Sequence, residues 1–281
     1  MLDFTKMTGI GNDYIYIDCT DGTKVKDIPE ITKKLSDRHF GIGADGVILI
    51  DKPDDDEKAD FKMKIYNSDG SEAEMCGNGI RCVAKFIHDK KLSDKDKLSI
   101  QTLAGIKKVK ILENKKGECN EAIVDMGEPL FQDNNIPYHV YEPFNKDLDI
   151  DVNGEKMRFT VVSMGNPHAV TFVEDVDKVE IEKCGPIVEN NPIFPNRTNV
   201  EFVQIIDKNN IKVRVWERGV GETYACGTGA CAAMVASGIN GYTDENVNVE
   251  LPGGKLEVEW GKDNHIYLQG PAETVYEGRI S

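Results

Sequence analysis

Two cysteines stand out because each opens the same short motif. Cys76 begins Cys-Gly-Asn-Gly and Cys226 begins Cys-Gly-Thr-Gly, and mostly apolar stretches follow at Ile80–His88 and Ala230–Ile239. Such stretches, poor in turn residues, predict deeply buried helices with a cysteine at each entrance. The first amides of a helix carry partial positive charge, which favours a bound carboxylate and lowers the pKa of a thiol. The glycines remove side-chain bulk, so a ligand can approach the backbone closely.

Two such entrances facing each other would suit a reaction at one carbon atom. A carboxylate held by the helix amides would place its α-carbon between two sulfur atoms. One thiolate would remove the α-proton while the opposite thiol delivers a proton to the other face, which inverts the stereocentre. The two thiols would share one proton and titrate as a coupled pair, and the backbone donors would stabilise the carbanion-like state. The pattern therefore predicts Cys76 and Cys226 as an acid–base pair.

The cysteine motifs belong to an internal repeat, and the length of 281 residues favours two domains over one. A Gly-Asn step ending at Asn12 or Asn166 comes first in each half, and a polar residue, Asn67 or Glu217, stands nine positions before each cysteine. Apolar and polar residues alternate just before these polar residues, over Phe61–Tyr66 and Ile211–Trp216, which predicts two half-buried strands. We therefore expect an α+β protein with two matched domains, each containing several strands around one buried helix. Pro129 and the stretch 132–137 favour a boundary soon after residue 125.

The composition of the chain limits the classes of binding partner and the cellular compartment to be expected. The formal net charge is −15, which argues against nucleic acid and anionic membrane surfaces. We find no signal peptide and no run of roughly 20 apolar residues. The seven cysteines are scattered and odd in number, unlike a secreted disulfide framework. We expect a cytoplasmic enzyme that acts on a small molecule.

No cofactor or metal is expected. The segment from Gly41 to Gly46 matches the G-x-G-x-x-G dinucleotide pattern, but it precedes the apolar run Val47–Ile50 instead of following a strand and opening a helix. No lysine stands out as a pyridoxal phosphate residue. The cysteine spacings and the scattered histidines do not form a metal-ligand set.

Two further groups carry chemistry in this pattern. Arg218 could bind a carboxylate through its two-pronged guanidinium, and Glu217 could accept from an ammonium group; the alternative is a solvated strand end. His168 follows the Gly-Asn step of the second half, which favours the edge of a site over an ordinary loop position. The five cysteines outside the repeated motif are interpreted as small buried side chains.

The chain resembles the diaminopimelate epimerase family. The stretch Asn67–Arg81 is similar to the first cysteine signature of that family. Further matching motifs run in family order over essentially the whole chain, at Gly9–Asp13, Gly165–His168, Asn196–Asn199, Glu217–Gly219 and Ala225–Gly229. The resemblance implies an isomerase that interconverts LL- and meso-diaminopimelate in lysine and peptidoglycan-precursor biosynthesis, without pyridoxal phosphate or metal. It also implies two pseudosymmetric domains, each a β-sheet or barrel around a central helix, at 1–125 with 270–281 and at 126–269.

The resemblance also assigns roles to individual residues. Cys76 and Cys226 would be the acid–base thiols, with His168 and Glu217 supporting catalysis. The amides of Gly77, Asn78, Gly227 and Thr228 would hold the reacting carboxylate. The distal end of the substrate would contact Asn12, Asn67, Asn166, Asn199, Glu217 and Arg218. Tyr276 matches a tyrosine at a dimer contact, so a homodimer is expected.

One position departs from the family pattern. Many members have glutamine where this chain has Gly46, so the contact expected there is lost or made by backbone. The nearest rival interpretation is a proline or hydroxyproline racemase-like enzyme, which uses a similar pair of cysteines on a small ring. A non-catalytic amino-acid-binding domain is the other alternative, and it would need only one functional helix entrance.

Overall fold

The computed structural model describes residues 2–54, 58–131 and 148–280. The predicted boundary stretch 132–137 lies outside these residues. The chain forms two compact units, Met1–Asp125 with Gln269–Ser281, and Met126–Leu268. Within the described ranges, no helix combines the length and the apolar character needed to cross a membrane.

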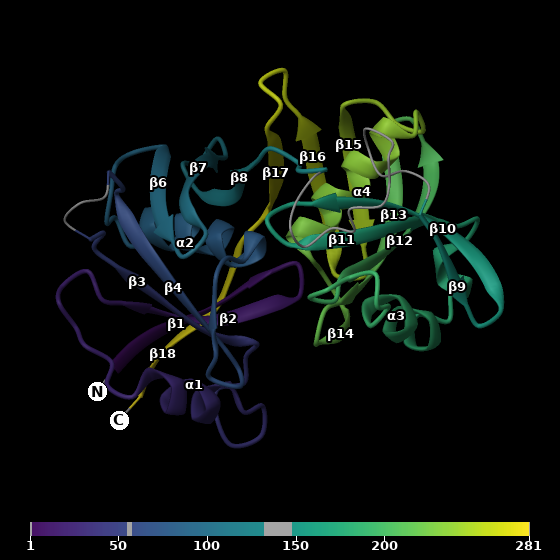
Figure 1. The fold of residues 1–281 in the computed structure, drawn as a ribbon. Coiled ribbons are helices and arrows are strands. Elements are labelled where there is room, and N and C mark those ends of the chain that lie inside the picture. Colours follow the sequence, from purple (N-terminus) through teal and green to yellow (C-terminus); the bar gives the residue numbers. More distant parts are fainter. Residues whose placement is uncertain (1, 55–57, 132–147, 281) are drawn as a thin grey trace. The chain divides into compact units, whose positions relative to one another are not determined.

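The first unit is built on a mixed sheet in which antiparallel and parallel pairings alternate. Its strands are β1 (Leu2–Gly9), β2 (Asn12–Asp18), β3 (Gly46–Asp51), β4 (Phe61–Asn67), β5 (Glu72–Ala73), β6 (Lys97–Thr102), β7 (Gly105–Glu113), β8 (Cys119–Gly127) and β18 (Glu273–Ile280). From β1 to β2, β3, β4, β6 and β7, successive neighbours pair antiparallel, parallel, antiparallel, parallel and antiparallel. The last strand, β18, pairs antiparallel with β1, so the C-terminal tail completes the unit in which the chain begins (Figure 1).

The second unit repeats this order of pairings. Its strands are β9 (Leu148–Val152), β10 (Glu155–Ser163), β11 (Pro167–Phe172), β12 (Asn199–Asp207), β13 (Asn210–Glu217), β14 (Gly221–Thr223), β15 (Asn246–Leu251), β16 (Gly254–Trp260) and β17 (Ile266–Pro271). From β10 to β11, β12, β13, β15 and β16, the same five pairings recur in the same sequence. The short hairpin of β4 with β5 likewise has a counterpart in that of β13 with β14.

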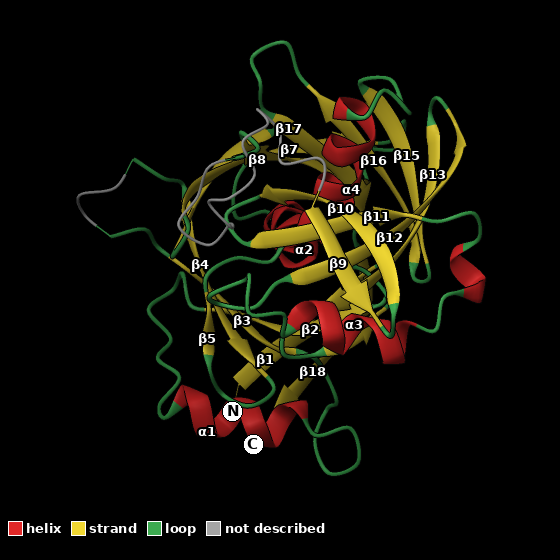
Figure 2. Ribbon diagram, turned by 45° about the vertical axis from the view of Figure 1, so that its right-hand side comes forward, coloured by secondary structure: helices red, strands yellow, loops and turns green. Residues whose placement is uncertain are grey.

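One long helix lies against the strands inside each unit. Helix α2 (Gly77–Asp89) packs on β1, β2 and β7, and helix α4 (Gly227–Ile239) packs on β10 to β13, β15 and β16, as Figure 2 shows for α4. Both helices are buried over most of their length, as their apolar composition predicts. Both begin three residues before the predicted apolar runs, because their Gly-x-Gly segments already form the first turn.

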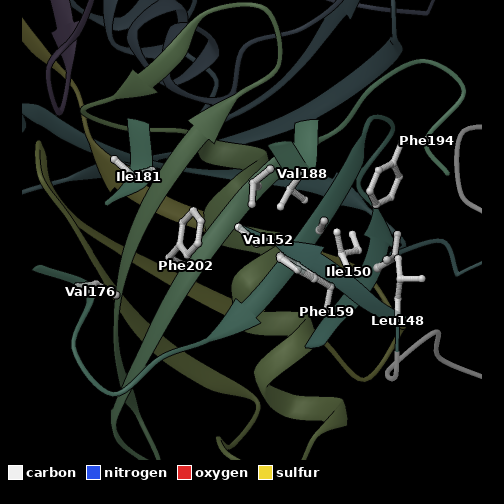
Figure 3. Close-up of a cluster of buried hydrophobic side chains, with 12 residues drawn as sticks. Leu148, Ile150, Val152, Phe159, Val176, Ile181, Val188, Phe194 and Phe202 are labelled. Carbon is white, nitrogen blue, oxygen red and sulfur yellow. The ribbon is translucent and has the colours of Figure 1, made fainter. Parts of the chain in front are cut away.

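A shorter helix covers the outer side of each sheet. In the first unit, α1 (Ile28–Ser36) contributes Leu35 to an apolar cluster with residues of β2 and β3. In the second unit, α3 (Ile181–Glu189) packs on β9, β12 and β13 through a cluster that includes Val188, Phe159 and Phe202 (Figure 3). A 3₁₀ turn, η1 (Val176–Lys178), precedes α3. The predicted α+β fold class, with strands around a helix in each of two domains, is confirmed.

Candidate active site

Both predicted cysteines cap a helix in the same way. Cys76 is the N-cap of α2 and Cys226 is the N-cap of α4, and both have extended backbone angles. The sulfur atom of each accepts a hydrogen bond at 3.3 Å from the backbone amide of the glycine three residues later, Gly79 or Gly229. N-cap side chains usually supply an oxygen for this purpose. Here the thiol sulfur does so, and each sulfur therefore contacts the positive end of a helix.

The second glycine of each motif is required by packing inside its own unit. A Cβ atom at Gly79 would lie 2.8 Å from Ile48 Cδ1, and one at Gly229 would lie 2.9 Å from Glu201 Oε1 and 3.3 Å from Cys226 Sγ. These two glycines thus have a packing role in addition to the predicted close approach of a ligand, which stays a prediction. They let the helix start lie directly against the strands.

In the first unit, Cys76 lies beside the turn between β1 and β2. The Cys76 thiol donates to Asn12 Oδ1 over 3.2 Å, and the Asn12 amide donates to Asp45 Oδ2 over 2.8 Å. Ile10 and Gly11 both have positive φ, which makes the tight turn that presents Asn12. Arg38 binds Asp45 at 2.9 Å. The Asn12 amide is thereby fixed at both ends, with its oxygen on the thiol.

Gly46 lies at the same edge of the sheet, between Tyr14 on β2 and Asn67 on β4. A Cβ atom at Gly46 would come within 2.0 Å of the Tyr66 carbonyl oxygen and 2.9 Å of Tyr14 Cε1. The backbone here therefore excludes the glutamine side chain that the family resemblance led us to expect at this position. Asn67 closes the next turn by donating from its side chain to Ser71 Oγ over 3.1 Å.

A buried arginine braces the start of α2. Arg81 has no exposed surface and donates to the Gly77 carbonyl at 3.1 Å and to Asn78 Oδ1 at 3.0 Å. The arginine thus holds the Asn78 side chain inside the unit. The guanidinium also adds positive charge behind that helix start.

In the second unit, a chain of polar contacts leads from Cys226 to a buried ion-pairing group. Thr228 Oγ1 lies 3.5 Å from Cys226 Sγ and accepts from the Asn166 amide over 3.4 Å. Asn166 Oδ1 lies 3.0 Å from His168 Nε2, and His168 Nδ1 lies 2.7 Å from Glu201 Oε1. His168 thus reaches the Cys226 thiol through Asn166 and Thr228.

The predicted Glu217-Arg218 pair lies at the end of β13, in the same unit. Glu217 accepts from the Thr223 hydroxyl over 2.6 Å, and its charge acts on Cys226. The Asn199 side chain accepts from the Arg218 amide over 2.9 Å and donates to the Pro167 carbonyl at the same distance. Asn199 therefore ties Arg218 to the strand that carries His168.

The expected low pKa is not found for Cys226. Burial raises the pKa of the Cys226 thiol well above its ordinary value, and the carboxylates of Glu217 and Glu201 raise it further. The hydrogen bonds from Thr228 and the Gly229 amide act in the opposite direction but do not offset these effects. The helix start stabilises a thiolate only when desolvation and neighbouring carboxylates allow it. Cys226 is consequently a neutral thiol, the form that can donate a proton.

Several residues of these two sites escape prediction from sequence. Glu201 is one of them. It stands in an apolar strand and is buried, and because burying a charge is costly, a glutamate in such a strand could have been recognised as a candidate site residue. The only sequence signal for Tyr14 is its position two residues after Asn12, because His168 stands at the same spacing after Asn166.

Tyr276, the predicted dimer residue, lies on β18. Its ring packs edge-on against Phe4, and 44% of its surface is exposed.

All seven cysteines are thiols and lie within the described residues. In that same part of the chain, no cluster of three or more His, Cys, Asp or Glu side chains is arranged to hold a metal ion.

The fold defines a structural class of two-domain α+β proteins, in which two units are each built around one buried helix. A structure from Bacillus anthracis, described as a phenazine biosynthesis protein of the PhzF family, matches with a TM-score of 0.71 at 20% identity, covering 100% of this chain and 99% of that one. A hydroxyproline epimerase from Agrobacterium vitis, with bound trans-4-hydroxy-L-proline, matches with a TM-score of 0.67 at 14% identity, covering 99% and 91%. These likenesses concern the fold alone.

Sequence similarity then places the chain within that class. The family model for diaminopimelate epimerase matches residues 4–131 and 160–275. A diaminopimelate epimerase of Methanococcus maripaludis is 53% identical over 99% of both chains, and one of Acetivibrio thermocellus is 50% identical over 99% of this chain and 98% of its own. This protein belongs to the diaminopimelate epimerase family and is an isomerase.

Proposed function

We propose that this protein interconverts LL- and meso-2,6-diaminopimelate by moving a proton between the thiols of Cys76 and Cys226. One observation carries the proposal: the same cysteine-capped helix start occurs in both units, in a chain of this family. The reaction would serve lysine and peptidoglycan-precursor biosynthesis in a reducing cytoplasm, and it needs neither pyridoxal phosphate nor a metal ion.

The protonation states of the thiols set the direction of the first step. Burial and the carboxylates of Glu217 and Glu201 favour the neutral form of the Cys226 thiol, so we assign to Cys76, in its thiolate form, the role of the base in the first step. Its sulfur takes the α-proton, and the electron pair of the broken C–H bond stays on the substrate as a carbanion-like state. The Cys226 thiol then gives its proton to the opposite face and becomes the thiolate. The reverse reaction begins from that state with the roles exchanged.

The helix starts would stabilise the developing charge. Backbone amides of Gly77, Asn78, Gly227 and Thr228 are the donors that we assign to the reacting carboxylate, since helix N-termini bind such anions well. The distal amino acid end would contact the polar groups at the edges of the two sheets, which are Asn12, Asn67, Asn166, Asn199, Glu217 and Arg218. His168 acts through Asn166 and Thr228, and we assign it a positioning role for the Cys226 thiol.

The test is solvent-deuterium incorporation at the α-carbon of diaminopimelate, combined with a stereospecific assay of the product. Cys76→Ala and Cys226→Ala should each abolish epimerisation while the protein stays folded, because each removes one of the two proton carriers. Cys82→Ala and Cys231→Ala, which change buried thiols within the same two helices, should remain active. Full activity of either N-cap variant would rule out the two-base mechanism.

The rival substrate class is tested in the same experiment. Racemisation of proline or hydroxyproline, with no turnover of diaminopimelate, would favour the racemase-like alternative. Solved structures described as a probable proline racemase and a hydroxyproline epimerase share the fold of this chain at 14% identity. Binding of diaminopimelate without deuterium incorporation would instead favour a non-catalytic binding protein.

A further inference from the structure

Tyr14 and His168 occupy equivalent positions in the two units. Each follows the Asn of its Gly-Asn step by two residues, on β2 or β11. In the parallel ladders that follow, Tyr14 pairs with Gly46 and His168 pairs with Asn199. Both side chains are buried, with exposures of 6% and 0%. The repeat therefore places an aromatic polar side chain behind each Gly-Asn turn.

The contacts of these two side chains correspond as well. His168 bonds to Asn166, whose amide leads through Thr228 to the Cys226 thiol. Tyr14 lies on the same strand as Asn12, whose Oδ1 is 3.2 Å from the Cys76 sulfur, and its hydroxyl interacts with both the Asn12 side chain and the Cys76 thiol. In the first unit the aromatic side chain thus reaches the sulfur with no intervening hydroxyl.

The space that Tyr14 occupies depends on the glycine opposite it. A side chain at Gly46 would begin 2.9 Å from Tyr14 Cε1, which is closer than atoms can pack. The Tyr66 carbonyl oxygen would be nearer still, at 2.0 Å. Glycine at 46 therefore leaves room for the Tyr14 ring as well as for the backbone of β4.

We propose that Tyr14 is a positioning residue for Cys76, whose sulfur it orients and whose thiolate form it stabilises by donating a hydrogen bond. The inference deepens the proposed function by adding a residue to the Cys76 half of the reaction, and it rests on that function only for the catalytic consequence.

The surroundings of Tyr14 favour a donor role. Burial raises the pKa of Tyr14 well above its ordinary value, and the charges of Cys76 and Asp45 add to the effect. Tyr16, two residues further along β2, is a further titratable neighbour of Tyr14. The Tyr14 hydroxyl therefore keeps its proton throughout the neutral range. A retained proton is what a thiolate acceptor requires.

The experiment is the pH dependence of Cys76 alkylation by iodoacetamide, followed by peptide mapping so that each thiol is read separately. Tyr14→Phe keeps the ring and removes the donor, so the alkylation midpoint of Cys76 should rise. Below the midpoint, the rate should fall about tenfold for each pKa unit of the shift. In the epimerase assay kcat should fall with little change in KM, because a group that does not touch the substrate affects the proton carrier alone.

Two further variants make the result specific. Tyr16→Phe removes another buried hydroxyl from the same strand, one that donates to the Gly79 carbonyl over 3.2 Å. This variant should shift the Cys76 midpoint less than Tyr14→Phe does, because Tyr16 affects Cys76 through charge and makes no hydrogen bond to its sulfur. Tyr14→His restores a donor and should alkylate faster than Tyr14→Phe. Circular dichroism and thermal unfolding verify the fold of each variant.

An unchanged Cys76 midpoint in Tyr14→Phe, or an equal shift in Tyr16→Phe, would overturn the proposal. A Tyr14→His rate no higher than that of Tyr14→Phe would also count against the hydrogen bond. If the midpoint shifts but the wild-type protein does not turn over diaminopimelate, the proposed function fails and the positioning role stands. If epimerisation proceeds and the Cys76 midpoint does not move in Tyr14→Phe, the proposed function stands and the positioning role of Tyr14 fails.

Discussion

His168 and Glu201 form a contact of 2.7 Å between two side chains that have no exposed surface. Burial raises the pKa of Glu201, while the histidine lowers it. The second carboxylate oxygen, Oε2, has no hydrogen-bond partner among the described residues. The pair is therefore fully desolvated, and the histidine is the partner that offsets part of the cost of burying the carboxylate.

Removing one member of this pair should cost more than removing both. His168→Leu leaves the Glu201 carboxylate buried alone, and we expect a loss of about 3–5 kcal/mol in the free energy of unfolding. The double variant with Glu201→Leu should recover much of that loss, because it buries no unpaired charge. Urea unfolding of the two single variants and the double variant measures this coupling. Additive losses would show that the two side chains act independently.

The Cys226 thiol should react slowly at neutral pH. Its pKa is raised by burial and by Glu217, so alkylation of Cys226 should increase only above about pH 9. Glu217→Gln should shift the midpoint downward. Glu222→Gln, which changes a carboxylate bound to Arg214 on the same hairpin, should not. Peptide-mapped alkylation across pH gives the answer, and a Cys226 midpoint that Glu217→Gln does not move contradicts the assignment.

The same shift has a consequence for stability. Because the folded pKa of Cys226 lies above the unfolded value, its contribution to stability is fully present below the unfolded pKa. The contribution is lost as the pH rises through the folded pKa. Thermal unfolding temperatures of the wild type should therefore fall above about pH 9 by more than those of Cys226→Ala. Parallel curves would contradict a raised pKa.

Gly46 should not tolerate a side chain. Gly46→Gln would drive a Cβ atom to within 2.0 Å of the Tyr66 carbonyl oxygen, so the strands must separate or the protein will be destabilised by about 3 kcal/mol or more. Gly238→Ala is the matched control, since its Cβ would lie 3.9 Å from the Trp260 ring. That variant should be neutral or stabilised by up to about 1 kcal/mol within α4. Equal stability of Gly46→Gln and the wild type, measured by urea unfolding, would refute the packing argument.

Arg81 should affect both stability and substrate affinity. Arg81→Met removes the donors to Gly77 and Asn78 and should lower stability by about 1–3 kcal/mol. It also removes positive charge behind the proposed carboxylate site, so KM for diaminopimelate should increase. Lys85→Met is the control, because Lys85 lies one turn further along α2 and donates to the Cys119 carbonyl. That variant should lose stability without a change in KM, and equal KM effects in both variants would count against a role for the Arg81 charge.

The expected homodimer should depend on Tyr276. Strand β18 is exposed along most of its length, and exposed strands are common association surfaces. Tyr276→Asp should shift the protein toward monomer in light scattering. Tyr242→Asp provides a closely matched control, because Tyr242 is also 44% exposed and also packs edge-on against a phenylalanine, Phe172. A protein that is monomeric throughout, or two variants that behave alike, would contradict this role for Tyr276.

Local patterns in the sequence were sufficient for much of the fold. The alternation over Phe61–Tyr66 and Ile211–Trp216 predicts two strands that the structure confirms as β4 and β13, because period-two patterning depends only on neighbouring residues. The two cysteine motifs predict helix starts for the same reason, since capping is a local property of the backbone. The helix bounds differ by three residues, because glycine-rich first turns do not resemble helix in composition.

By itself the sequence determined the fold class, the family and the positions of Cys76 and Cys226 at two helix starts. All of these depend on residue types at fixed spacings. Only the tertiary structure decided the environment of each sulfur. The raised pKa of Cys226, the buried contact of His168 with Glu201 and the pairing of Tyr14 with Gly46 all join residues from different strands and turns. Desolvation and the effect of nearby charges depend on distances between residues that are far apart in the sequence. They can therefore be determined only from the arrangement of the strands in the structure.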